Sequence, residues 1–151
     1  MTDENFRRVW AERAGDYFTA TFGLAPVTAR LLAWLMICEP AEQSGSELAA
    51  ALGASRASVT ASLRLAQAAG FVSRRTRRGD RTVYYAIGDD AWHEVVRRRI
   101  ASMGAFVQIA DQAIGRIEDG GRIRAARDVF AWLGTLADAP DLSHARKEPH
   151  Q

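Results

Sequence analysis

Apolar residues recur at helical spacing in the first third of the chain. The stretch 3–22 predicts an amphipathic helix that ends at Gly23. Its apolar stripe consists of Phe6, Trp10, Ala14, Tyr17 and Thr21. A second helix begins at Pro26, which suits a first helical turn, and ends before Pro40. The inward face of this second helix consists of Leu31, Trp34, Leu35 and Cys38.

Two short helices separated by a tight turn follow. Ser44 and Glu47 have the spacing of a capping box, so a helix begins there, and Gly53 ends it. Ser55 is a second N-cap, and the helix after it runs to Gly70. We expect the two helices to pack through Leu48, Leu52, Val59, Leu63 and Ala66. The pattern is typical of a helix-turn-helix motif.

The period changes from helical to alternating after Gly70. The segments 71–77 and 82–87 predict two strands, with Val83, Tyr85 and Ile87 on one face. The residues RRGDR between them suit a turn, because Gly and Asp tolerate the backbone of a tight loop. A helix-turn-helix followed at once by a β-hairpin is a winged helix. The sequence therefore predicts a mainly α fold with a small β-hairpin wing and extra helices at both ends.

A long helix of up to about 30 residues, roughly 45 Å, is expected after Asp89 and Asp90. Its apolar residues repeat at steps of four and three, which is a heptad seam. The seam consists of Val96, Ile100, Met103, Val107, Ala110, Ile114 and Ile117. Gly104 and Gly115 lie on one face, which indicates close approach by another helix. A last helix follows the break at 119–121 and carries Ile123, Ala126, Phe130, Leu133 and Ala137.

The apolar faces of the terminal helices exceed what a small winged helix can cover. We therefore expect a two-fold homodimer in which these helices interleave. The heptad seam, together with Phe130 and Leu133, forms the expected interface. The chain 1–151 is interpreted as a single domain, with dimerisation helices at 3–22 and 89–137 and a winged-helix lobe at 26–87. The polar tail 138–151 is expected to be disordered.

Charge is concentrated in one part of the chain. Residues 54–81 contain seven arginines and one acid, a local net charge of +6, so the rest of a chain whose total is +2 carries −4. A basic block on an otherwise acidic protein indicates that a polyanion meets one face. The alternative is a solvated charged loop.

The second helix of the motif directs polar side chains away from its apolar face. Hydroxyl and guanidinium groups in its first turns suit base edges and phosphates of double-stranded DNA, and Arg56 at its start is a candidate for reading a base. Arginines on the wing suit a neighbouring minor groove. Arg74 and Arg75 contact phosphate or nothing. The candidate DNA-binding residues are Ser55, Arg56, Ser58, Thr60 and Arg64 on the helix and Arg77, Arg78 and Arg81 on the wing.

These motifs occur in the order of a known family. The sequence resembles the MarR family of bacterial transcription regulators, in particular its GbsR-type branch, in the segments TARLLAWLMICEP, SELAAALGASRASVTASLR, AGFV and GDRTVYYAIGDDAW. The wing pattern of that branch is matched by Gly79-Asp80-Arg81, Tyr84-Tyr85, Asp89-Asp90 and Trp92. Gly45 stands where that pattern has an apolar residue, and Ala66 where it has a larger aliphatic one. The resemblance implies a homodimeric repressor that binds a pseudo-palindromic operator.

Two features leave alternatives open. The aromatic residues of the helices either line a pocket for a small-molecule effector or belong to an ordinary core; these are Trp10, Tyr17, Trp34, Trp92 and Phe106. Aromatic boxes bind quaternary ammonium groups, and the resembled family includes regulators of choline and betaine metabolism. Cys38 is either an oxidation sensor or a buried structural thiol.

Composition excludes several other functions. A single cysteine cannot form an internal disulfide, and three scattered histidines lack metal-ligand spacing, so we expect no metal and no cofactor. The sequence has no Ser/His/Asp set, carboxylate pair or phosphate loop, which argues against an enzyme. The longest apolar run, Leu31–Cys38, is too short to span a bilayer, and the first residues lack a signal peptide. We expect a cytosolic protein that associates with the nucleoid through its operator.

One rival interpretation belongs to another class of function. A winged helix can serve as a protein-interaction or dimerisation module that does not bind DNA. Such a module has no need of arginines on both the second helix of the motif and the wing, and this chain has them on both.

Overall fold

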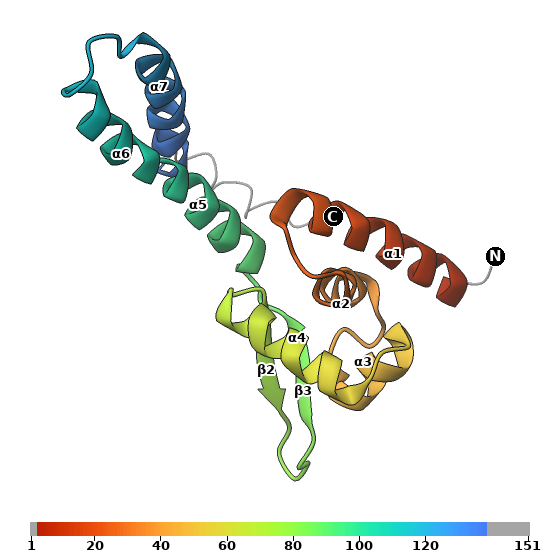
Figure 1. The fold of residues 1–151 in the computed structure, drawn as a ribbon. Coiled ribbons are helices and arrows are strands. Elements are labelled where there is room, and N and C mark those ends of the chain that lie inside the picture. The colour runs from red at the N-terminus through yellow and green to blue at the C-terminus, as the bar shows by residue number, and fades with distance from the viewer. Residues whose placement is uncertain (1–2, 139–151) are drawn as a thin grey trace, which may run out of the picture. The chain divides into compact units, whose positions relative to one another are not determined.

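The computed structural model describes residues 3–138, and the chain divides into two compact units, 1–91 and 92–151 (Figure 1). The first unit contains α1 (Asp3–Phe22), α2 (Pro26–Ile37), β1 (Gln43–Ser44), α3 (Gly45–Leu52), α4 (Arg56–Ala68), β2 (Val72–Thr76) and β3 (Val83–Ile87). Then come α5 (Ala91–Met103), α6 (Ala105–Ile114), α7 (Gly121–Thr135) and the 3₁₀ turn η1 (Leu136–Asp138). The tail expected to be disordered lies outside the described residues from 139 onward.

Helix α2 forms the centre of the first unit. Leu31 and Leu32 are fully buried although they are adjacent in sequence and point in different directions. A helix that is apolar on all sides must be covered on all sides, and α1, α3, α4 and β3 all contact α2. The predicted inward face of this helix is confirmed, because Leu31, Trp34, Leu35 and Cys38 are buried.

Helix α1 has the predicted bounds, but its apolar stripe is not the face that packs on α2. The residues buried in α1 are Ala11, Gly15 and Phe18, whereas Phe6, Tyr17 and Thr21 are exposed and Trp10 and Ala14 are half-buried. The reason is the close crossing of α1 over α2. A Cβ atom on Gly15 would lie 2.9 Å from Cγ of Arg30, so the small residues make the contact. Much of the apolar stripe is therefore exposed inside the first unit.

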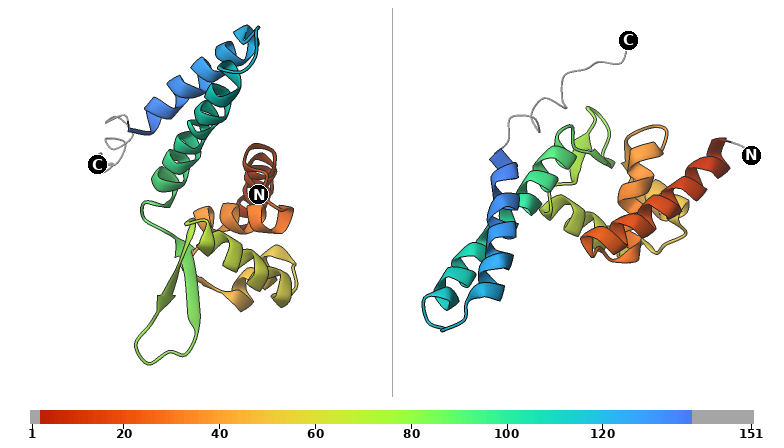
Figure 2. Two further views of the ribbon diagram at one scale, coloured as in Figure 1. Left: turned by 60° about the vertical axis from the view of Figure 1, so that its left-hand side comes forward. Right: turned by 90° about the horizontal axis from the view of Figure 1, so that it is seen from above.

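The helix-turn-helix and the wing form as the sequence predicts. Ser44 and Glu47 make a complete capping box, Gly53 ends α3 in the left-handed conformation, and Ser55 caps α4. The inward residues of both helices are buried. Strands β2 and β3 pair antiparallel with Val72 opposite Ile87, and their loop projects beyond the helices of this unit (Figures 1 and 2).

The sequence pattern missed one strand. The two residues of β1 pair antiparallel with β3, so the sheet has the order β1-β3-β2. A strand of this length carries no alternation that a sequence can display. The pairing joins the start of α3 to the wing, because Ser44 is both the N-cap of α3 and the partner of Tyr84.

The second unit differs from the single long helix that the sequence predicts. The helix is divided at Gly104 and ends at Ile114, so Ile117 lies beyond it. Gly104 permits a close approach by α7, since a Cβ atom on Gly134 of that helix would lie 3.2 Å from the Cα atom of Gly104. Gly115 has nothing that a Cβ atom would meet within the described chain, and it ends α6 instead.

Much of the apolar surface of the second unit remains uncovered. Ala110 of the predicted seam is buried, and Phe106 packs on Phe130 with ring centroids 4.8 Å apart. None of the residues of α7, all of which are described, is fully buried, and Trp132 on this helix is 61% exposed. Among residues 3–138, no helix is long and apolar enough to cross a membrane.

A buried hydrogen bond between α2 and α4 allows a test of this packing. The Thr28 hydroxyl donates to Oγ of Ser62 at 3.1 Å, and both side chains are buried. We expect Ser62→Ala to lower the free energy of unfolding by about 1–3 kcal/mol, because it leaves a buried hydroxyl unsatisfied. The double variant Thr28→Val/Ser62→Ala should recover most of that loss in urea denaturation. If the double variant loses as much free energy of unfolding as Thr28→Val and Ser62→Ala lose together, the hydrogen bond does not explain the effect.

Candidate nucleic-acid interface

The polar face of α4 is fixed by the packing of its apolar face. Val59, Leu63 and Ala66 are almost completely buried, so the residues on the other side of the helix must face solvent. Of the predicted contacts on this helix, Ser55, Arg56, Thr60 and Arg64 are exposed and Ser58 is half-buried. Ala57 beside them is also exposed, and its small side chain allows the helix to approach the floor of a DNA major groove closely.

Most of the predicted arginine contacts carry charge that the protein does not neutralise. Arg56, Arg64, Arg78 and Arg81 have no ion-pair partner among residues 3–138, and all four are exposed. Arg75 is the partner of Asp89 at 3.8 Å. The first unit thus has unneutralised positive charge on both α4 and the wing, as a polyanion-binding surface requires.

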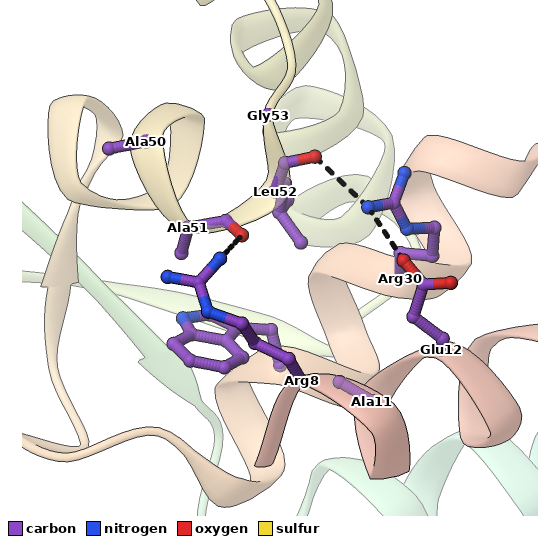
Figure 3. A pocket seen from close by; sticks show the side chains of 9 residues that line it. Arg8, Ala11, Glu12, Arg30, Ala50, Ala51, Leu52 and Gly53 are labelled. Atoms are coloured by element: carbon purple, nitrogen blue, oxygen red, sulfur yellow. Dashed lines mark hydrogen bonds and ion pairs between the residues drawn. The ribbon is translucent and has the colours of Figure 1, made fainter. Parts of the chain in front are cut away.

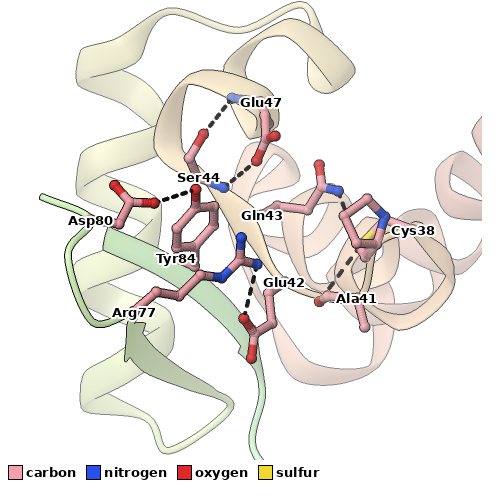
Figure 4. A network of polar contacts seen from close by, with 10 residues as sticks. Cys38, Ala41, Glu42, Gln43, Ser44, Glu47, Arg77, Asp80 and Tyr84 are labelled. Carbon is pink, nitrogen blue, oxygen red and sulfur yellow. Dashed lines mark hydrogen bonds and ion pairs between the residues drawn. The ribbon is translucent and has the colours of Figure 1, made fainter. Parts of the chain in front are cut away.

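Arg77 is held by the protein itself (Figure 4). One guanidinium nitrogen lies 3.2 Å from Oε2 of Glu42, which precedes β1. The guanidinium also stacks over the ring of Tyr84, 3.8 Å from its centroid. Arg77, which the sequence predicts to contact DNA, therefore already contacts Glu42 and Tyr84 within the protein. The adjacent Arg78 has no ion-pair partner within residues 3–138.

Asp80 organises the tip of the wing. Its carboxylate accepts a hydrogen bond from the Thr82 backbone N–H at 2.8 Å and another from the Tyr84 hydroxyl at 2.9 Å. Both bonds hold the pKa of Asp80 below its usual value, the backbone bond contributing most. The same carboxylate raises the pKa of Tyr84. Gly79 before it has φ +80°, the left-handed region that favours glycine, so the loop is set before any ligand arrives.

Two arginines from outside the motif bind the end of α3 (Figure 3). The guanidinium of Arg8 on α1 donates to the carbonyl of Ala51 at 3.0 Å, and that of Arg30 on α2 donates to the carbonyl of Leu52 at 3.0 Å. Arg30 also lies 3.2 Å from Glu12. The last carbonyls of a helix lack partners inside the helix, so these arginines attach α3 to α1 and α2. They line a cavity of about 220 Å³.

The five aromatic residues proposed for an effector pocket are not brought together within one unit. Trp34 lines the cavity beside Arg8, whereas Trp10 and Tyr17 line a separate, open hollow of about 480 Å³ with Met36. Trp92 and Phe106 belong to the second unit, where Phe106 packs on Phe130.

Cys38 is buried at the end of α2, and burial raises the pKa of its thiol to about 11. A thiol in this state is almost entirely protonated near neutral pH and reacts slowly, which favours the structural interpretation of this residue. Within residues 3–138, no group of three His, Cys, Asp or Glu side chains could hold a metal ion.

Sequence reasoning missed the residues that hold the contacts in place. Glu42 lies 35 positions from Arg77, and Ser46 on α3 accepts a hydrogen bond from the guanidinium of Arg56 ten positions away. Arg8 lies 43 positions from the carbonyl that it binds. No periodic pattern links positions so far apart, so only the fold reveals these partners.

Three comparisons with known proteins agree with this geometry. A sequence model described as MarR family matches residues 22–81, which include the helix-turn-helix and the wing up to Arg81. The HTH-type transcriptional regulator MmpR5 of Mycobacterium tuberculosis is 33% identical over 136 residues, which cover 86% of this chain and 82% of that protein. A solved structure titled as a transcriptional regulator superposes with a TM-score of 0.74 at 30% identity, over 94% of this chain and 99% of that one. With an exposed polar α4 and a basic wing in the matched segment, the chain belongs to the MarR family of DNA-binding transcription regulators.

Proposed function

We propose that this regulator is a cytosolic homodimeric repressor that binds a pseudo-palindromic operator through α4 and the wing. The observation that supports it best is the unneutralised charge on both elements: Arg64 of α4 and Arg78 and Arg81 of the wing have no acidic partner among residues 3–138. Helix α4 enters a major groove, and the wing arginines lie along an adjacent minor groove or its phosphates.

The dimer is supported by the apolar surface that one chain leaves uncovered. Ile109 and Trp132 of the second unit are more than 60% exposed, and Tyr17 of α1 is 60% exposed. Single exposed apolar residues are common, but several on the same pair of short helices mark an interface. A second copy supplies the missing cover. Two-fold symmetry then places two α4 helices for the two halves of a palindromic site.

Two finer parts of the proposal concern branch and control. Assignment to the GbsR-type branch rests on the wing residues Gly79-Asp80-Arg81 and the pair Tyr84-Tyr85. Control by a small-molecule effector is supported by the two hollows that α1 and α2 line, one beside Trp34 and one beside Trp10. Binding in the hollow beside Trp34 would act on DNA recognition through Arg8 and Arg30, which line it and hold the end of α3.

The test of the repressor proposal starts from the DNA that the protein retains in cells. Sequencing those fragments should give a short inverted repeat upstream of a regulated gene, and deleting the protein should raise transcription from that promoter. Retention of fragments without a shared repeat, or unchanged transcription, would contradict the proposal. The same experiment discriminates against an interaction module, which would retain no DNA.

The role of the wing can be measured with Arg81→Ala. Operator binding should weaken, and the slope of log affinity against log salt should fall by about one unit per protomer, because each lost phosphate contact no longer releases counterions. The melting temperature should hardly change, since Arg81 is exposed and has no ion-pair partner among residues 3–138. Arg122→Ala on α7 is the matched control for loss of an exposed arginine. If Arg81→Ala binds the operator as tightly as the parent at every salt concentration, the wing does not contact DNA through Arg81.

The proposed interface can be tested with a charge in the seam. Ile100→Asp and Val107→Asp should each convert the dimer to monomer in sedimentation experiments and abolish operator binding, because a carboxylate would be buried without a partner. Gln108→Asp introduces the same charge at an exposed polar position on α6 and should leave the dimer intact. Dimers that persist in both seam variants would show that another face of the helices forms the interface.

A further inference from the structure

Arg56 is the first residue of α4, yet its side chain is attached to α3. Its guanidinium donates a hydrogen bond from Nη1 to Oγ of Ser46, in the first turn of α3. The neighbouring residue of that turn is Gly45. A Cβ atom on Gly45 would lie 3.5 Å from Nη2 of Arg56, so the guanidinium lies beside the position that a side chain would occupy there.

The charge of Arg56 is not compensated at this place. Arg56 has no ion-pair partner among residues 3–138. The starts of α3 and α4 both carry the positive end of a helix dipole. The positive charge of a guanidinium at two helix N-termini is not compensated there, and a DNA phosphate would compensate it.

We propose that Ser46 and Gly45 position Arg56 for a phosphate of the DNA backbone and not for a base edge. This inference rests on the proposed operator binding. In a helix-turn-helix, the first helix crosses the backbone of the duplex while the second enters the major groove. A guanidinium bonded to the first turn of α3 therefore lies near the sugar-phosphate backbone of the DNA, which α3 crosses. One N–H group is used by Ser46, and the others remain for phosphate oxygens.

Gly45 has a specific part in this arrangement. The residue departs from the apolar pattern of the resembled family, and the structure gives a physical reason, since the guanidinium of Arg56 occupies the space beside it. An alanine there would make ordinary van der Waals contact with the guanidinium, whereas a longer, branched side chain would displace it. Base reading then falls to Thr60 and Arg64, which are exposed and have no side-chain hydrogen-bond partner among residues 3–138.

The test compares binding to the operator and to random DNA of equal length over a series of salt concentrations. Arg56→Ala should weaken both by the same factor, so the ratio of the two affinities stays within about twofold of the parent. At about 0.15 M salt, one phosphate contact contributes about fivefold per protomer, so the dimer should lose about twenty-five-fold. The salt slope should fall by about one unit per protomer.

The second arm isolates the positioning residues. Ser46→Ala should shift binding in the same direction as Arg56→Ala but by less, and Ser46→Thr, which keeps a hydroxyl, should restore it. The double variant Ser46→Ala/Arg56→Ala should bind no more weakly than Arg56→Ala alone, because Ser46 acts through Arg56. Gly45→Val should resemble Ser46→Ala, and Gly45→Ala should resemble the parent. Melting curves of each variant check that α3 still folds.

Three outcomes would overturn the inference. A tenfold or greater loss of discrimination in Arg56→Ala, with random-DNA binding unchanged, would make Arg56 a base reader. Parental binding by Ser46→Ala while Arg56→Ala is weakened would remove Ser46 from the contact. Additive losses in the double variant would give Ser46 its own contact with DNA. If the parent protein binds neither the operator nor random DNA, the proposed function itself is wrong.

Discussion

The burial of α2 on every side is the constraint on which the recognition surface depends. Leu31 and Leu32 are fully buried, and α1, α3 and α4 all contact this helix. Because α4 must turn Val59 and Leu63 toward the core, its helical period leaves Thr60 and Arg64 facing outward. The residues available to DNA are therefore determined by packing on the opposite side of the same helix. The buried bond between Thr28 and Ser62 fixes the rotation of α4 further.

Ionic and polar contacts between elements hold the recognition surface in place before DNA is bound. Arg8 and Arg30 bind the final carbonyls of α3 from one side. On the other side, β1 pairs with β3, and Glu42 fixes Arg77 on the face of the sheet. Exposed pairs of this kind contribute little to the free energy of unfolding. Their effect is on orientation, since a surface that is already ordered loses less entropy when it binds.

The sequence was most informative where a single residue determines local geometry. Ser44 and Gly53 mark the ends of α3 because their chemistry acts within one helical turn. It was least informative about which side of a helix is buried. The apolar stripe of α1 does not indicate which face packs on α2, because Gly15 lets α1 approach α2 through small residues and leaves Tyr17 exposed. The contact of Arg77 with Glu42 joins positions too far apart for any local pattern.

Hydroxyl-radical footprinting of the retained operator can show whether two copies of α4 and the wing read one inverted repeat. We expect two protected regions related by two-fold symmetry, with centres about 34 Å or ~10 base pairs apart along the duplex. Further protection is expected in the flanking minor grooves, because the exposed arginines Arg78 and Arg81 of the wing loop suit a narrow minor groove. A footprint over a single half-site, or uniform protection without symmetry, would show that the protein does not bind as a symmetric pair of α4 helices.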